Sequence, residues 1–124
     1  MKDIIIFIKE SMVVESQALK LLTKLDSVIN NDSKLKTYIK SKEEYLTSLH
    51  LGSSDITDIK DIMQYFHAAL VSMAEEGEEE DIDMYIEDAP EILSDDFEED
   101  WVEPAIYLYK KLYKETNGKD LVTE

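Results

Sequence analysis

The chain of 124 residues contains no cysteine and no arginine, and it has only three glycines, two prolines and two histidines. Without cysteine there can be no disulfide, zinc–thiolate site, iron–sulfur cluster or cysteine nucleophile. Without arginine there is no bidentate clamp for a phosphate or carboxylate group. The few histidines and the scattered glycines do not assemble into the usual sites for catalysis or phosphate binding. We therefore predict that the protein is not an enzyme and needs no cofactor.

Long apolar runs are also lacking. The N-terminus has a run of only five residues, at positions 4–8, whereas a membrane span needs about 20 and a signal peptide also needs a longer apolar stretch. Apolar residues still make up 44% of the chain, which is close to the average for globular proteins, so one core can be filled. The composition predicts a single soluble domain over residues 1–124, and the absence of cysteine suits the cytoplasm.

The spacing of apolar residues is helical through most of the chain. They recur at intervals of three and four over residues 15–30, 35–50 and 56–77, as expected for amphipathic helices. The third of these stretches is the most apolar, so it is predicted to be the central helix, and Gly52 is predicted to cap the helix before it. Residues 3–13 fit either a strand or a helix, and helix is favoured because no second strong strand is available for pairing.

Two later helices are predicted from their start signals. Asp88 can act as N-cap for a helix with Pro90 in its first turn and Glu91 at the capping-box position. Pro104 is predicted to start the last helix, which Gly118 closes. The sum is an all-α, single, compact, bundle-like domain of about five or six helices.

The whole net charge of −16 lies in residues 75–103, which we call the acidic segment. Sixteen of its 29 residues are Asp or Glu and none is basic, while the rest of the chain balances 13 acids with 13 lysines. Isoleucine, tyrosine, phenylalanine and tryptophan are threaded through the segment, unlike the composition of a disordered acidic tail. Acids that serve only solubility would be mixed with lysine, as they are elsewhere in the chain. A folded surface with one sign of charge therefore indicates a basic partner.

The charge density of the acidic segment approaches that of a nucleic acid. If it were wholly helical it would span about 44 Å, with one charge per ~2.7 Å against one per ~1.7 Å in duplex DNA. In general character (small, acidic, free of cysteine, helical) the chain is similar to DNA mimics and to nuclease immunity proteins. The same charge would repel nucleic acids and anionic membranes, so neither is expected to bind directly.

The leading hypothesis is a small acidic inhibitor, either an immunity or antitoxin-like protein or a nucleic-acid mimic. It would bind and block a basic partner such as a nuclease toxin or another nucleic-acid-binding protein. The alternative is a non-catalytic adaptor or regulatory protein that binds its partner through an apolar helical face. The predicted partner-binding residues are Glu78, Glu79, Glu80, Asp81, Asp83, Tyr85, Glu87, Asp88, Asp95, Asp96, Glu98, Glu99 and Asp100.

No dedicated metal site is predicted. Residues 81–86 depart from the EF-hand calcium loop at its fifth and sixth positions. A di-metal carboxylate bundle needs Glu three residues before His, but Thr47 precedes His50 and Gln64 precedes His67 at that distance. His67 follows a core position, so it is predicted to be a hydrogen-bonded histidine at the core boundary.

Trp101 is the one tryptophan, and it stands among acids of the acidic segment. Leu93, Phe97 and Trp101 are spaced four residues apart, which would place them on one face of a helix. The spacing predicts that the inner edge of the indole lies in the core. Its acidic neighbours would then point outward.

Overall fold

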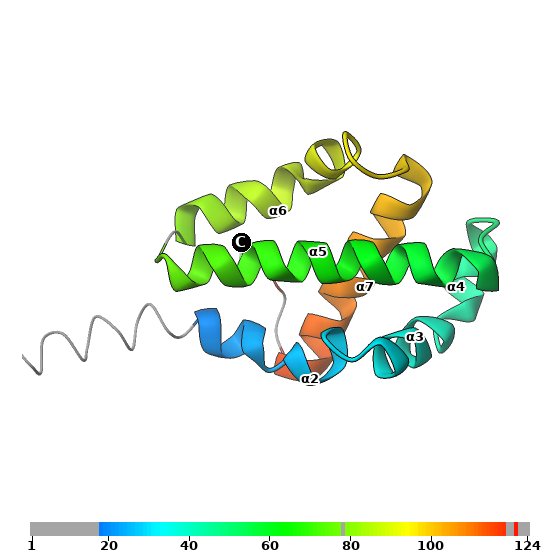
Figure 1. Cartoon of the computed structure of the whole chain (residues 1–124), viewed down its shortest axis with the longest axis horizontal. Coiled ribbons are helices and arrows are strands. Elements are labelled where there is room, and N and C mark those ends of the chain that lie inside the picture. Colours follow the sequence, from blue (N-terminus) through cyan, green and yellow to red (C-terminus); the bar gives the residue numbers. More distant parts are fainter. Residues whose placement is uncertain (1–17, 78, 119–120, 122–124) are drawn as a thin grey trace, which may run out of the picture.

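Helix α5 (Ile56–Glu75) lies at the centre of the computed structural model (Figure 1), which describes residues 18–77, 79–118 and 121. Its apolar stripe is buried from Ile59 to Leu70. Helix α7 (Glu99–Asn117) crosses it and makes the most extensive contact with it. Helices α2 (Asp26–Ile29), α3 (Asp32–Lys40) and α6 (Glu79–Leu93) also contact it, and α4 (Glu43–Ser48) follows α3.

The predicted all-α, bundle-like fold is confirmed, since no strand forms between residues 18 and 118 in the described part of the chain. Two predicted helices are divided. Residues 18–23 form one helical segment and α2 another, while α3 and α4 share the stretch predicted as a single helix over 35–50. The assignment of residues 3–13 lies outside the described residues.

Helix α6 passes through the helix start predicted at Asp88, and that prediction was wrong. Pro90 lies inside α6 on its exposed side. A proline in a helix interior costs about 3 kcal/mol because it removes one backbone hydrogen bond. The buried stripe outweighs this cost, since each fully buried aliphatic side chain contributes about 1.5–3 kcal/mol. That stripe consists of Ile82, Ile86, Ala89 and Leu93.

Helix α7 begins at Glu99, five residues before the predicted start at Pro104. Glu99 and Asp100 lie in its first turn, where carboxylates are favourable beside the positive end of the helix dipole. Pro104 is buried within the helix rather than at its start. The predicted end is confirmed, because Gly118 adopts a left-handed conformation with φ of 73° and its N–H donates to the Lys114 carbonyl.

His50, and not Gly52, adopts the left-handed conformation at the end of α4, so the predicted glycine cap was wrong. The φ angle of His50 is 63°. The Leu51 N–H donates to the Leu46 carbonyl at 2.9 Å, which is the hydrogen bond of a Schellman motif. Gly52 instead donates its N–H to Asp55 Oδ2 at 2.8 Å, in the short 3-10 turn η1 (Ser53–Asp55).

We expect His50→Gly to be more stable than His50→Ala by about 1 kcal/mol, measured by urea denaturation. Both variants remove the imidazole, but only glycine adopts the left-handed conformation without a steric cost. Equal stabilities for the two variants would contradict the need for this conformation at position 50.

A buried polar network links three helices across the core. The imidazole of His67 is only 2% exposed, and its Nδ1 lies 2.6 Å from Tyr109 Oη while its Nε2 lies 2.6 Å from Asp26 Oδ1. Burial raises the pKa of Tyr109 well above its usual range, so the hydroxyl stays protonated. We assign the proton of a neutral His67 to Nε2, which donates to Asp26, and Nδ1 then accepts from Tyr109. The predicted hydrogen bonding of His67 is confirmed, but its ring lies within the core rather than at the core boundary.

A second polar cluster fixes α3 on α5. Lys60 is buried, and its Nζ lies 2.9 Å from Asp61 Oδ1 and 3.4 Å from Asp32 Oδ1. Gln64 donates to Asp32 and to the carbonyl of Ile29, which closes the end of α2. These contacts compensate the buried ammonium group and set the position of the α2–α3 corner.

We expect Tyr109→Phe to lower the free energy of unfolding by about 1–3 kcal/mol, because it leaves a buried acceptor of His67 without its donor. Tyr113→Phe is the matched control. Its ring is also buried, but its hydroxyl makes no hydrogen bond to any residue in the described ranges. Urea denaturation of the two variants checks this, and equal losses would contradict the role assigned to the Tyr109 hydroxyl.

Candidate functional site

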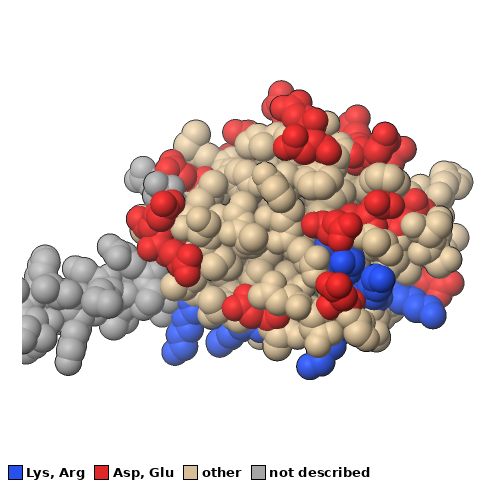
Figure 2. Space-filling model, viewed as in Figure 1, with Lys and Arg blue, Asp and Glu red and all other residues tan. Residues whose placement is uncertain are grey.

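The exposed carboxylates of α6, of the loop at residues 94–98 and of the first turn of α7 form one surface, which we call the acidic face. Figure 2 shows Asp and Glu without lysine over the upper part of the molecule, where α6 and this loop lie, whereas along the lower and right edges acids and lysines are mixed. The ion pairs of the described residues use Asp32, Asp61 and Glu115, and Asp26 accepts the hydrogen bond from His67. None of these ion pairs involves a carboxylate of the acidic face whose side chain the structure describes.

The predicted partner-binding acids fall into two adjoining groups. One group lies exposed on α6 and the other lies exposed in the loop and at the start of α7. Glu78 lies outside the described residues, and Glu79 and Glu80 are placed only by their positions in α6. The first group is Asp81, Asp83, Glu87 and Asp88, and the second is Asp95, Asp96, Glu98, Glu99 and Asp100.

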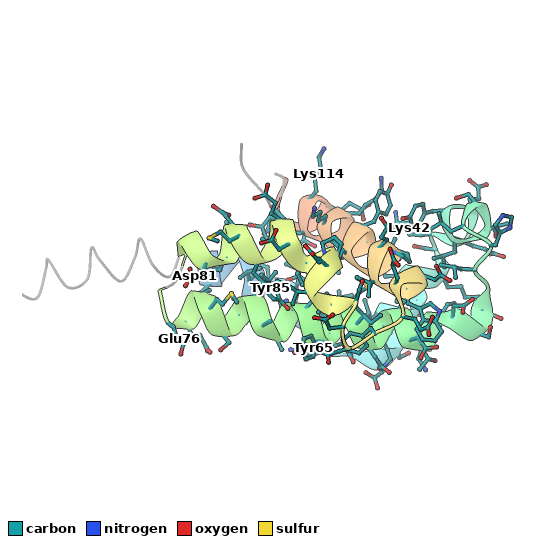
Figure 3. The ribbon with its side chains drawn as sticks, turned by 90° about the horizontal axis from the view of Figure 1, so that it is seen from above. Lys42, Tyr65, Glu76, Asp81, Tyr85 and Lys114 are labelled. Atoms are coloured by element: carbon teal, nitrogen blue, oxygen red, sulfur yellow. The ribbon has the colours of Figure 1, made fainter. Side chains whose placement is uncertain are left out.

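Tyr85, the aromatic residue among the predicted partner-binding residues, packs toward the core. Its ring stacks on Phe66 of α5 with the centroids 5.6 Å apart and an angle of 23° between the planes. Figure 3 shows Tyr85 between α6 and α5. Burial raises the pKa of its hydroxyl, and the nearby Tyr65 adds to the shift. Tyr85 therefore helps to pack α6 against α5, and only part of its ring is accessible to a partner.

Met84 is an exposed apolar residue of the acidic face that the sequence analysis did not single out. Its side chain is 62% exposed. Asp81, Glu87 and Asp88 lie three or four residues away on the same helix, so carboxylates surround it on the helix surface. The signal was present in the sequence, because the buried stripe that begins at Ile82 places position 84 on the opposite side of α6.

Trp101 joins the acidic face to the core. The predicted shared helix face was wrong, because residues 94–98 form a loop between Leu93 at the end of α6 and Trp101 in α7. Trp101 is nevertheless half-buried against the core, as predicted for its inner edge. Its Nε1 donates to Asp55 Oδ1 at 2.9 Å. Hydrogen bonds from the Gly52 backbone and then from Trp101 hold the pKa of Asp55 below its ordinary value of 3.8.

We expect Trp101→Phe to raise the pKa of Asp55 part of the way back to 3.8, because the indole N–H is lost while the larger contribution from Gly52 remains. The folded-state pKa is lowered, so Asp55 stabilises the fold above 3.8 and this contribution is lost as the pH falls through the folded-state pKa. Carboxyl chemical shifts recorded during an acid titration measure both values. A pKa of Asp55 that is the same in both proteins would contradict the indole–carboxylate hydrogen bond.

The remaining chemistry of the described residues is limited. No three side chains of His, Asp or Glu lie close enough together there to hold a metal ion. Both ring nitrogens of His67 are engaged and its ring is buried, so a substrate has no access to it. No helix in the described ranges is both long and apolar enough to cross a membrane.

No protein-family model matches this chain, and no curated protein and no solved structure matches it.

Proposed function

We propose that this protein is a small acidic inhibitor that binds and blocks a basic partner, such as a nuclease toxin or another nucleic-acid-binding protein. The observation that supports this most is the acidic face, which bears many exposed carboxylates and no ion pair within the described residues. Unpaired charges of one sign repel one another and oppose the compact state. A basic surface would relieve that repulsion on binding and would be steered to it over about one Debye length, roughly 8 Å at physiological salt.

The helices that bear the acidic face are fixed to the core by buried side chains. The α6 part of this face is anchored to the core through Ile82 and Ile86, and its α7 part through Val102, all of which are buried. A partner therefore would not have to order this surface on binding, which favours affinity. The proposed mechanism is occlusion, in which the carboxylates occupy the positions that nucleic-acid phosphates would take on the partner.

Apolar groups within the acidic face would provide lasting contacts. Met84 stands among the carboxylates, and Ile92 is also exposed on α6. Methionine is unbranched and adapts to irregular surfaces, and buried apolar anchors contribute much of the energy at protein interfaces. In this proposal, the charges set the rate of association and the apolar groups slow dissociation.

The proposal assigns no catalysis and no cofactor to the chain, and it places the protein in the cytoplasm. The burial of His67, whose two ring nitrogens are both engaged, supports the first part. The absence of cysteine supports the second.

An adaptor that binds through an apolar face is the second candidate. Tyr65 of α5 is 50% exposed and contacts Phe97 edge-to-face, with the ring centroids 5.5 Å apart. Together with Met84 and Ile92 it places large apolar groups on helices α5 and α6. On this alternative, binding would depend on these groups and would be insensitive to charge.

We expect Glu87→Lys to weaken partner binding by about tenfold, or ~1.4 kcal/mol, and to do so mainly by slowing association. Glu115→Lys is the matched control, since it makes the same change of charge at an exposed position of α7 outside the acidic face, where Glu115 forms a surface ion pair with Lys42 and lies beside Tyr38. Partners are captured from a lysate of the source cells on immobilised wild-type protein. Each is then purified, and its association rate and its cleavage or binding of nucleic acid are measured with all three proteins.

The proposal requires that wild-type protein inhibits the captured partner and that association slows between about 20 and 200 mM salt. It fails if the rate does not depend on salt, or if Glu87→Lys and Glu115→Lys behave alike. Loss of binding in Met84→Ser with no effect of Glu87→Lys would support the adaptor instead.

A further inference from the structure

A groove of about 750 Å³ lies between the end of α4 and residues 100–110 of α7, next to the acidic face. Its volume is within the range of pockets that enclose a small ligand or a few residues of a peptide. Its walls combine aromatic, aliphatic and charged groups. They include Tyr45 and Leu49 on one side and Asp100, Glu103, Tyr107 and Lys110 on the other.

The apolar part of the groove is built around a pair of tyrosines. The rings of Tyr45 and Tyr107 stack with centroids 4.2 Å apart and planes inclined by 25°. Leu49 and Tyr107 are each 42% exposed, so the groove presents apolar surface to solvent. Burial, followed by the nearby Tyr107 and Glu103, raises the pKa of the Tyr45 hydroxyl, which agrees with a carboxylate close to this pair.

The charged groups of the groove are ordered along α7. Asp100 and Glu103 come first, Tyr107 follows one turn later and Lys110 one turn after that, all on the groove side of the helix. Along α7 the groove is therefore negative at one end, apolar in the middle and positive at the other end, and His50 also lines it. A cationic group would be attracted to the end with the two carboxylates and repelled from the end with Lys110.

We propose that this groove binds a lysine or arginine side chain that the basic partner presents on an apolar segment. The cation would lie beside Asp100 and Glu103, and its aliphatic stem would cover Leu49 and the part of Tyr107 that Tyr45 and Lys111 leave exposed. Long cationic side chains bury their stems on apolar surface and keep the charge at a carboxylate. A second copy of this chain is disfavoured as the occupant, because two molecules of charge −16 repel each other.

This inference rests on the proposed function for the class of partner, but it concerns a different surface from the α6 part of the acidic face. The probe is the acetylated and amidated peptide Leu-Arg-Leu, compared with the same peptide in which citrulline replaces arginine. Citrulline has nearly the same shape without the charge. Binding is followed through the amide chemical shifts of isotope-labelled protein.

The arginine peptide is expected to shift the amides around Leu49, Glu103 and Tyr107, and the citrulline peptide to bind at least about tenfold more weakly. Glu103→Gln should weaken the arginine peptide at least about fivefold. Glu76→Gln is the matched control, because Glu76 is also an exposed acid, at the opposite end of the molecule from Lys42 (Figure 3), and should leave the affinity unchanged.

Equal affinity for the two peptides, shifts confined to α6, or no saturable shift in the groove would overturn this inference. So would groove shifts that depend on protein concentration without peptide, because a second copy would then be the occupant. The proposed function is judged separately by Glu87→Lys and the captured partner. It can stand when the groove fails, and the groove can bind the arginine peptide when Glu87→Lys proves harmless.

Discussion

The packing of α5 against α7 is the contact on which the rest of the structure depends. Phe66 of α5 meets Tyr109 of α7 edge-to-face at the centre of this contact, with their centroids 5.0 Å apart. The hydroxyl of Tyr109 then orients His67, which in turn holds Asp26 of α2. One crossing of two helices thus positions a third helix that is distant in sequence. The hydrogen bonds of this network are directional, so they select one packing where apolar burial alone would accept several.

The acidic face exists because α6 separates its residues cleanly. Ile82 and Ile86 are buried and bind the helix to the core, so the carboxylates on the other side of the helix point to solvent. Part of the resulting repulsion is offset locally, since Glu99 and Asp100 lie at the positive end of the α7 dipole. The rest of the repulsion is not offset by ion pairs with lysine among the described side chains. The repulsion between these carboxylates would be relieved if a cationic partner bound to the surface.

The acidic face and the groove share the first turns of α7 but differ in their chemistry. On α6, separate carboxylates surround Met84, which suits a broad basic surface. In the groove, two carboxylates lie at one end, next to the apolar surface of the Tyr45–Tyr107 pair, which suits one inserted side chain. A partner that used both would be steered by the first and oriented by the second.

The sequence by itself determined the helical class, the central place of α5, the end of α7 at Gly118 and the position of the charge, because these depend on residue type and on spacings of three or four. Only the tertiary structure decided the rest. Burial of the α6 stripe carried that helix through Pro90, and contact with Phe66 turned Tyr85 inward. The hydrogen bond from Trp101 to Asp55 and the stacking of Tyr45 on Tyr107 each join residues that are tens of positions apart in the sequence. Such pairings have no local signal, since they arise when whole helices pack and bring distant faces together.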